Sequence, residues 1–235
     1  EFVPVPDSIN TIFEGSGGAY EAHLGTGFTI LKNLSIGINA GYLFGSKDFS
    51  SRRSISNDTV FHYMSNHETK SNYGGLMTNA GIQYTIELNS GKQQKHLLRL
   101  GAYGSLKQNF NGTRDRIVET FQYNSGTGAP TTIDSVYHEN GVSGEVVYPA
   151  TYGAGIIFDK VGKFLIGADY STTAWSEYRF FGEQEPVRDS WTAHVGAQIF
   201  PSGGKGYWNN VFYRAGVSFG TDYISADKDL PKWSA

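Results

Sequence analysis

Two neighbouring stretches alternate apolar and small polar residues so regularly that they restrict the fold more than any other feature of the sequence. In 20–31 the larger members of the alternation are Tyr20, Ala22, Leu24, Thr26, Phe28 and Ile30. In 34–44 they are Leu34, Ile36, Ile38, Ala40, Tyr42 and Phe44. A period of two is that of a β-strand, whose successive side chains point to opposite faces. Only Lys32 and Asn33 separate the stretches, so the sequence predicts a tight hairpin.

The rest of the chain repeats this rhythm. Further pairs of alternating segments are 76–88 with 96–106, 150–158 with 164–174, and 191–200 with 213–219. Long segments at 47–59, 109–149 and 181–189 lie between the pairs, so short and long connections take turns, as in barrels with one trimmed end. Weaker alternation in 60–68, 117–123 and 133–142 predicts that strands continue into the long segments, for about ten to twelve strands in all.

The polar face of the predicted strands indicates a membrane barrel. No run of about 20 apolar residues is present, which excludes a spanning helix but not spanning strands. Charged residues are only 17% of the chain, and the polar faces carry mostly Gly, Ser, Thr, Asn and Gln. No charge interrupts the apolar rows, where one would cost about 2–4 kcal/mol at the bilayer midplane. We therefore predict an all-β, antiparallel transmembrane β-barrel; a soluble sandwich or lipocalin-like barrel is the alternative.

Composition excludes several functional classes. The absence of cysteine removes thiol catalysis, disulfides and cysteine-ligated zinc, and a net charge of -3 offers no basic face for nucleic acid. The sequence predicts one barrel domain over 1–235. The opening EFVPVPDSIN lacks the features of a secretory signal, so we expect either a removed signal or a piece of a longer chain that is truncated at both ends.

The texture of several strands resembles the FadL-type outer-membrane transport proteins. The resemblance rests on EGSGGAYEAHLGTGFTILKNLSIGINAGYLFGS, on LRLGAYGSL, ATYGAGIIF and FYRAGVSFGTDYI, and on FLIGADYSTTAWSEY, which ends at Trp175 to Tyr178. It implies a fourteen-stranded barrel with an amino-terminal plug that carries hydrophobic molecules through a lateral opening, or a PorV-like accessory barrel of a larger complex. The chain departs from this pattern because no plug segment precedes Glu14 and DLPKWSA is not an amphipathic strand with a terminal aromatic.

Polar residues on the inward face are the candidates for a site. The predicted lumen-lining residues are Glu21, His23, Asn39, Gln83, Glu87, Arg99, Asp169, His194 and Arg214. Their charges could link Glu21, Glu87 or Asp169 to Arg99 or Arg214 and either stiffen the barrel or line a passage. The six histidines include no pair with metal-ligand spacing, and no catalytic motif is present. We expect no metal, no cofactor and no enzymatic activity, although a barrel hydrolase using a serine and a histidine stays an alternative.

The leading functional prediction is transport of small hydrophobic compounds across the outer membrane of a Gram-negative bacterium. The alternative is a non-enzymatic accessory or structural subunit of an outer-membrane secretion or assembly complex, and a third class is a soluble binding domain. Expected partners are outer-membrane lipid, lipopolysaccharide, a hydrophobic cargo and other proteins of a membrane complex, but not nucleic acid. The candidates for binding lipopolysaccharide phosphate are Arg52, Arg53, Arg114 and Arg116, although solvated loop charge is the interpretation that we favour for them. We expect the long loops to be extracellular and the short turns periplasmic.

Overall fold

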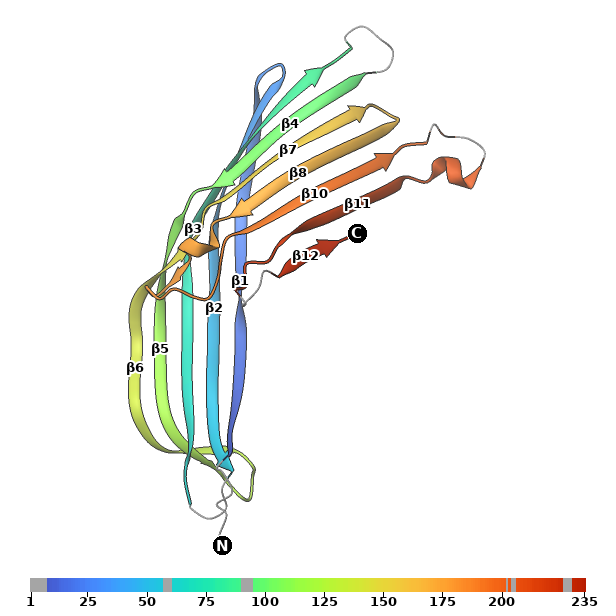
Figure 1. The fold of residues 1–235 in the computed structure, drawn as a ribbon. Coiled ribbons are helices and arrows are strands. Elements are labelled where there is room, and N and C mark those ends of the chain that lie inside the picture. Colours follow the sequence, from blue (N-terminus) through green and yellow to red (C-terminus); the bar gives the residue numbers. More distant parts are fainter. Residues whose placement is uncertain (1–7, 57–60, 90–94, 202, 204–205, 226–229) are drawn as a thin grey trace. The chain divides into compact units, whose positions relative to one another are not determined.

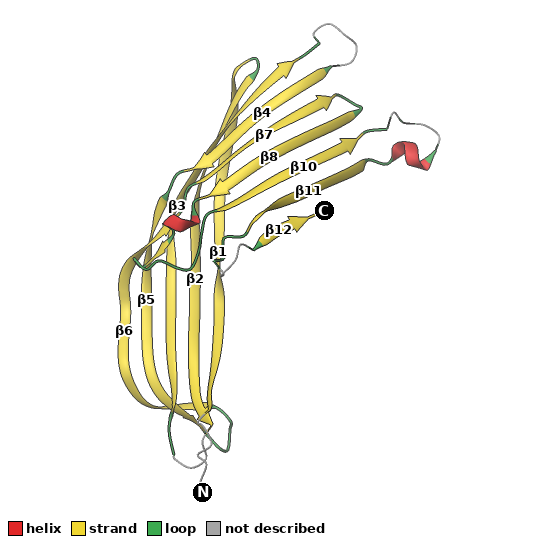
Figure 2. Ribbon diagram, viewed as in Figure 1, coloured by secondary structure: helices red, strands yellow, loops and turns green. Residues whose placement is uncertain are grey.

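The described chain consists almost entirely of β-strands (Figures 1 and 2). The computed structural model describes residues 8–56, 61–89, 95–201, 203, 206–225 and 230–235. The strands are β1 (Ser8–Leu31), β2 (Leu34–Ser56), β3 (Met64–Glu87), β4 (His96–Ser105), β5 (Gln108–Tyr123), β6 (Pro130–Tyr148), β7 (Thr151–Lys160), β8 (Phe164–Thr173), β9 (Arg179–Phe180), β10 (Ser190–Ile199), β11 (Tyr213–Thr221) and β12 (Pro231–Ser234). Two short 3-10 helices, η1 (Trp175–Glu177) and η2 (Tyr207–Asn210), complete the elements. None of the helices in the described ranges has the length and apolarity that crossing a membrane requires.

Antiparallel pairing joins the strands into one sheet. Its main path runs β12-β11-β10-β8-β7-β4-β3-β5-β6-β9, and β2 pairs with both β1 and β3. Strand β3 is long enough to pair with two strands on the same side, β5 along Met64–Gly74 and β4 along Ala80–Glu87. The all-β antiparallel fold and the hairpin at Lys32–Asn33 are thereby confirmed.

Contacts within the chain group it into two compact units. Unit 1 comprises Glu1–Glu21, Leu43–Gly75 and Phe110–Val146, and unit 2 comprises Ala22–Tyr42, Leu76–Asn109 and Val147–Ala235. Strands β1, β2 and β3 each contribute one part of their length to each unit. The single barrel domain over 1–235 stays a prediction.

The strands of unit 2 have the length and alternation of membrane-spanning strands. β4, β7, β8 and β10 have 10 residues each and β11 has 9, while a tilted transmembrane strand needs about 9–11. The register places one apolar row across the sheet on what we call the outer face: Tyr84, Leu100, Ile156, Ala168, Val195 and Val217. The neighbouring row, on the opposite or inner face, is Gln83, Gly101, Gly155, Asp169, His194, Ser218 and Ser234.

Aromatic side chains flank the apolar rows of unit 2 at both strand ends. At the end of the short turns, the rings of Phe158 and Phe164 are 5.9 Å apart and those of Phe200 and Phe212 are 5.4 Å apart. At the opposite end, Trp191 contacts Tyr170 and Phe219 with both centroid distances at 5.9 Å. Aromatic girdles of this kind mark the two water interfaces of membrane barrels.

Unit 1 contains long strands in segments that the sequence analysis assigned to connections. Residues 47–56 are strand within β2, and 109–149 forms most of the β5–β6 hairpin. Its interior is small: Phe110, Phe121, Val146 and Leu43 are buried. Gly75 makes room for Phe110, because a Cβ there would lie 2.6 Å from the ring.

The segment DLPKWSA also differs from the expectation that it forms no amphipathic strand. Its residues Pro231–Ser234 form β12 beside β11, with Trp233 opposite Phe219 on the outer face and Ser234 opposite Ser218 on the inner face. Four residues are too few for an alternation to be recognised in the sequence. The two faces of this strand are therefore seen only from its pairing with β11. Within the described residues, β1 and β12 each have one paired neighbour.

Candidate functional site

The inner face of unit 2 forms a wide cavity of about 1350 Å³. Polar lining residues include Asn39, Gln83, Arg99, Asp169, His194, Ser218 and Ser234, and apolar ones include Met77, Tyr103, Ile157 and Leu165. Five of the nine predicted lumen-lining residues therefore border one cavity: Asn39, Gln83, Arg99, Asp169 and His194. A concave wall that combines apolar side chains with a few convergent polar groups is typical of ligand sites.

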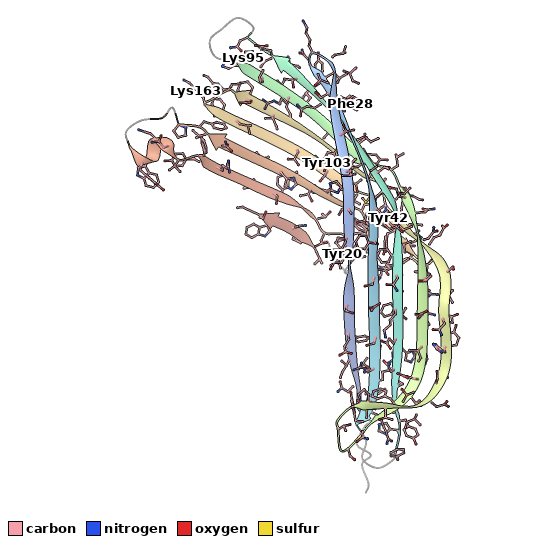
Figure 3. All side chains as sticks on the ribbon, turned by 180° about the vertical axis from the view of Figure 1, so that it is seen from behind. Tyr20, Phe28, Tyr42, Lys95, Tyr103 and Lys163 are labelled. Carbon is pink, nitrogen blue, oxygen red and sulfur yellow. The ribbon has the colours of Figure 1, made fainter. Side chains whose placement is uncertain are left out.

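Glycines in the cavity wall allow neighbouring strands and rings to approach closely. At Gly155 a Cβ would lie 2.9 Å from the Cβ of Asp169, so the neighbouring strand approaches too closely for a larger residue. At Gly153 the ring of Tyr103 (labelled in Figure 3) occupies the place of a side chain, and a Cβ would meet its Cζ at 2.6 Å. Gly101 differs, because the nearest atom to a Cβ would be the Ile82 carbonyl oxygen at 3.9 Å. The wall can therefore accept a side chain at Gly101 but not at Gly153 or Gly155.

Asp169 and His194 form the most defined polar pair of the cavity. Their strands β8 and β10 place them opposite each other, and Asp169 Oδ1 lies 2.7 Å from His194 Nδ1. Ser218 is opposite His194 on β11, but its Oγ is hydrogen-bonded to Ser234 Oγ at 2.8 Å. Among the described residues no serine is hydrogen-bonded to His194, so the row lacks the nucleophile–base contact of a serine hydrolase. The row thus holds one hydrogen-bonded Asp–His pair and one hydrogen-bonded Ser–Ser pair.

The charged candidates find other partners than the sequence analysis suggested. Arg99 Nη2 is 2.9 Å from Asp159 Oδ2, and Lys95 Nζ is 3.6 Å from Glu87 Oε1. Arg214 donates from Nε to Gln198 Oε1 at 2.5 Å. These are neighbouring-strand contacts, so the carboxylates and guanidinium groups are matched locally rather than across a lumen. Glu87 and Arg214 do not line the cavity.

Three further candidates, Glu21, His23 and Asn39, lie along β1 and β2, and Gln83 lies on β3. Asn39 Nδ2 donates to Asn79 Oδ1 at 2.7 Å, which ties β2 to β3 on the inner face. His23 faces Gly41, where a Cβ would lie 2.6 Å from the histidine Cβ. Glu21 belongs to unit 1. The lumen-lining role of all nine residues stays a prediction.

Sequence reasoning missed the partners Asp159, Asn79 and Gln198. The signal for Asp159 was present in the alternation, because it continues the inner-face series of Gly153, Gly155 and Ile157. The signal was overlooked because Asp159 ends its strand beside a turn, where a charge is ordinarily solvated.

Unit 1 carries a second, smaller cavity of about 210 Å³ among charged side chains. It is lined by Glu68, Lys70, Asp115, Arg116, Ile117, His138 and Asn140. Lys70 Nζ lies 2.9 Å from Glu68 Oε1. The hydrogen bond and the charge of Glu68 raise the pKa of the Lys70 amine, with smaller contributions from Asp48 and Asp115. In the described part of the chain, no group of three or more acidic or histidine side chains could hold a metal ion.

Among known proteins, one family model and a solved structure match the chain. Of the solved structures, the CymD monoaromatic hydrocarbon channel matches over 95% of this chain and 76% of its own, with 12% identity and a TM-score of 0.37. No curated protein matches the sequence. The model of the BamG family matches residues 5–229, nearly the whole length. The chain therefore belongs to the BamG family and is an outer-membrane β-barrel protein.

Proposed function

We propose that this protein is a non-enzymatic accessory or structural subunit of an outer-membrane secretion or assembly complex. In this proposal unit 2 lies in the bilayer and unit 1 lies outside it as the surface that partners bind. The observation that carries the proposal is the aromatic surface of unit 1, in a part of the chain that lipid cannot cover.

Unit 1 is unsuited to hydrocarbon. Paired charges occupy the middle of its strands, with Lys70 opposite Asp115 and Ser71 opposite Arg114 on successive positions, so both faces are charged. Each such charge would cost about 2–4 kcal/mol at a bilayer midplane. Residues Met64–Gly75 alone extend roughly 36–40 Å at a strand rise of about 3.3 Å per residue. We therefore place unit 1 in water.

Large aromatic side chains are nevertheless exposed where β3 begins and β5 ends. The rings of Phe61 and Tyr63 are 5.0 Å apart, and those of Phe121 and Tyr123 are 5.5 Å apart. Met64, the first residue of β3, pairs with Phe121, so the segment that leads into β3 lies beside the end of β5. Phe61 is 76% exposed. Phe121 itself is buried, so the exposed rings are those of Phe61, Tyr63 and Tyr123, which we call the aromatic tip. A contiguous apolar patch in water marks a protein interface, and aromatic residues are enriched there.

The orientation follows from the asymmetry of the connections. Unit 2 has short turns at one strand end, such as Lys32–Asn33 and Val161–Lys163, whereas unit 1 continues β1, β2 and β3 at the other. Barrels of the outer membrane have short periplasmic turns and long extracellular loops. We propose that unit 1 is extracellular.

Purification of the full chain from its membrane in mild detergent tests this proposal. The double variant Phe61→Ser with Tyr123→Ser should lose co-purifying proteins but keep heat-modifiable migration, which reports the folded barrel. Tyr20→Ser is the matched control, because Tyr20 is 68% exposed in unit 1 and contacts Phe44 rather than the tip. A wild-type chain that always elutes alone, or equal loss of partners in the control, would contradict the proposal.

A second candidate function is the transport of small hydrophobic compounds, as in FadL-type barrels. The cavity of unit 2 favours it, because Tyr103, Ile157 and Leu165 give apolar contacts beside Arg99, Asn39 and Gln83. Gly101→Phe should fill the cavity without a backbone clash, since a Cβ at this position meets no atom closer than 3.9 Å. Uptake of a hydrophobic cargo should fall in this variant. Unchanged uptake of every candidate compound would exclude transport through the cavity.

A further inference from the structure

The ends of β4, β7 and β8 gather three lysines beside a cluster of rings. Main-chain hydrogen bonds tie the segments together, with Val161 N donating to Lys95 O at 3.1 Å and Lys163 N donating to Lys160 O at 2.8 Å. Figure 3 labels Lys95 and Lys163 at this short-turn end of unit 2. We call Lys95, Lys160 and Lys163 the lysine cluster.

Charges in the lysine cluster are only partly balanced. Lys95 has Glu87 at 3.6 Å, a contact in which both side chains are well exposed, at 63% and 36%. Asp159, the other acidic residue of this strand end, is held by Arg99 at 2.9 Å. Among the described residues, Lys160 and Lys163 have no carboxylate within salt-bridge distance. Two ammonium groups are therefore available to an anion.

Aromatic rings border the lysine cluster on the outer face. Lys160 shares this face with Phe158, and the register places it between His96 and Phe164. Phe158 contacts Phe164 at 5.9 Å and His96 at 6.0 Å between ring centroids. The row below consists of Leu98, Phe158, Ile166, Ala197 and Ala215, with no charge. The ammonium group of Lys160, above an aromatic border and an apolar wall and with Lys163 in the adjoining turn, matches a lipid that has one phosphate and acyl chains.

We propose that the lysine cluster binds the headgroup of an anionic glycerophospholipid whose acyl chains lie along this apolar row. The assignment rests on the proposed orientation, which puts the short turns in the periplasmic leaflet. Lipopolysaccharide carries its phosphates on a bulky sugar core, for which the three-residue turn Val161–Lys163 is a small contact surface. A soluble acidic protein would leave the adjoining aromatic and apolar surface in the bilayer unused.

Spin-labelled lipids and the full chain reconstituted in phosphatidylcholine vesicles test the proposal. Labelled phosphatidylglycerol should be preferred over labelled phosphatidylcholine at the protein surface, and added salt should reduce the preference. Lys160→Gln with Lys163→Gln should lower the preference on the order of 5-fold per lysine. Lys32→Gln removes the same charge from another short turn and should leave the preference unchanged.

Three results would overturn the proposal: no preference in the wild type, no change in the double variant, or an equal loss in the Lys32 variant. Stronger competition by lipopolysaccharide than by phosphatidylglycerol would overturn the choice of lipid. Folding of each variant is checked by heat-modifiable migration. A cysteine at position 163 that is labelled from outside intact cells would refute the orientation. The co-purification experiment tests the proposed function alone, so a failure of the lipid proposal can be distinguished from a failure of the proposed function.

Discussion

Replacing Val195 by arginine should destabilise the protein because Val195 lies in the middle of the proposed lipid-facing surface. Val195 occupies the centre of the ten-residue β10, is 46% exposed, and has Ala168 and Val217 beside it in register. No same-face neighbour can pair with a guanidinium group, because Asp169 points to the inner face. An arginine at the bilayer midplane costs about 2–4 kcal/mol, so we expect a loss of this size relative to Val195→Ala.

Two matched controls for Val195→Arg place an arginine at another depth in the bilayer or on the other face of β10. Ile199 is on the same face, four residues along β10, which is roughly 10 Å toward the interface for a strand tilted by about 40°. Ile199→Arg should cost only about 0–1 kcal/mol. Thr192 is on the inner face opposite Ser171, and Thr192→Arg should likewise cost little because its side chain points away from the proposed lipid-facing surface.

The assay is unfolding by denaturant of each variant refolded in phospholipid vesicles, with the free energy taken from the fraction that keeps heat-modifiable migration. An equal cost at 192 and 195, or no cost at 195, would refute the assignment of the two faces.

Three further outcomes follow from the structure. Phe110→Ala should destabilise unit 1 by about 3–5 kcal/mol, because Phe110 is fully buried against Gly75, and protease digestion should then cut unit 1 before unit 2. Gly153→Val should impair folding because its side chain would strike the Tyr103 ring, and Tyr103→Ala in the same chain should restore part of the folded fraction. The pKa of Lys70 is raised in the folded protein, so its ion pair with Glu68 stabilises the fold fully below the unfolded pKa near 10.5. This stabilisation is lost as the pH rises through the folded pKa of Lys70. Because the pair is exposed, the difference in stability between wild type and Glu68→Gln should be small at neutral pH and absent at high pH.

The strands of unit 2 were largely predictable from the sequence. Their alternation has the period of a strand. An apolar outer face and an inner face of small residues leave few positions that break this alternation, as the row from Tyr84 to Val217 shows. The hairpins followed because short polar connections such as Lys32–Asn33 interrupt the pattern. In unit 2 the local sequence pattern and the environment of each face therefore predict the same strands.

Unit 1 was only partly predictable because both faces of its sheet carry charged residues. Its strands need no strict alternation, so the charged positions Lys70 and Asp115 read as loop residues. The pairing of Phe110 with Gly75 depends on strands that are distant in sequence. Cavity contacts such as Asn39 with Asn79 likewise depend on register, which a single sequence does not reveal.

Site-directed spin labelling along β10 tests most directly the claim that unit 2 faces lipid with one side. The natural chain has no cysteine, so single cysteines at positions 191–199 can each carry one label after reconstitution in vesicles. Relaxation by lipid-soluble oxygen should peak at the odd positions, and relaxation by a water-soluble nickel complex should peak at the even ones. Oxygen and nickel profiles that rise and fall together, or nickel access at 193, 195 and 197, would contradict the account.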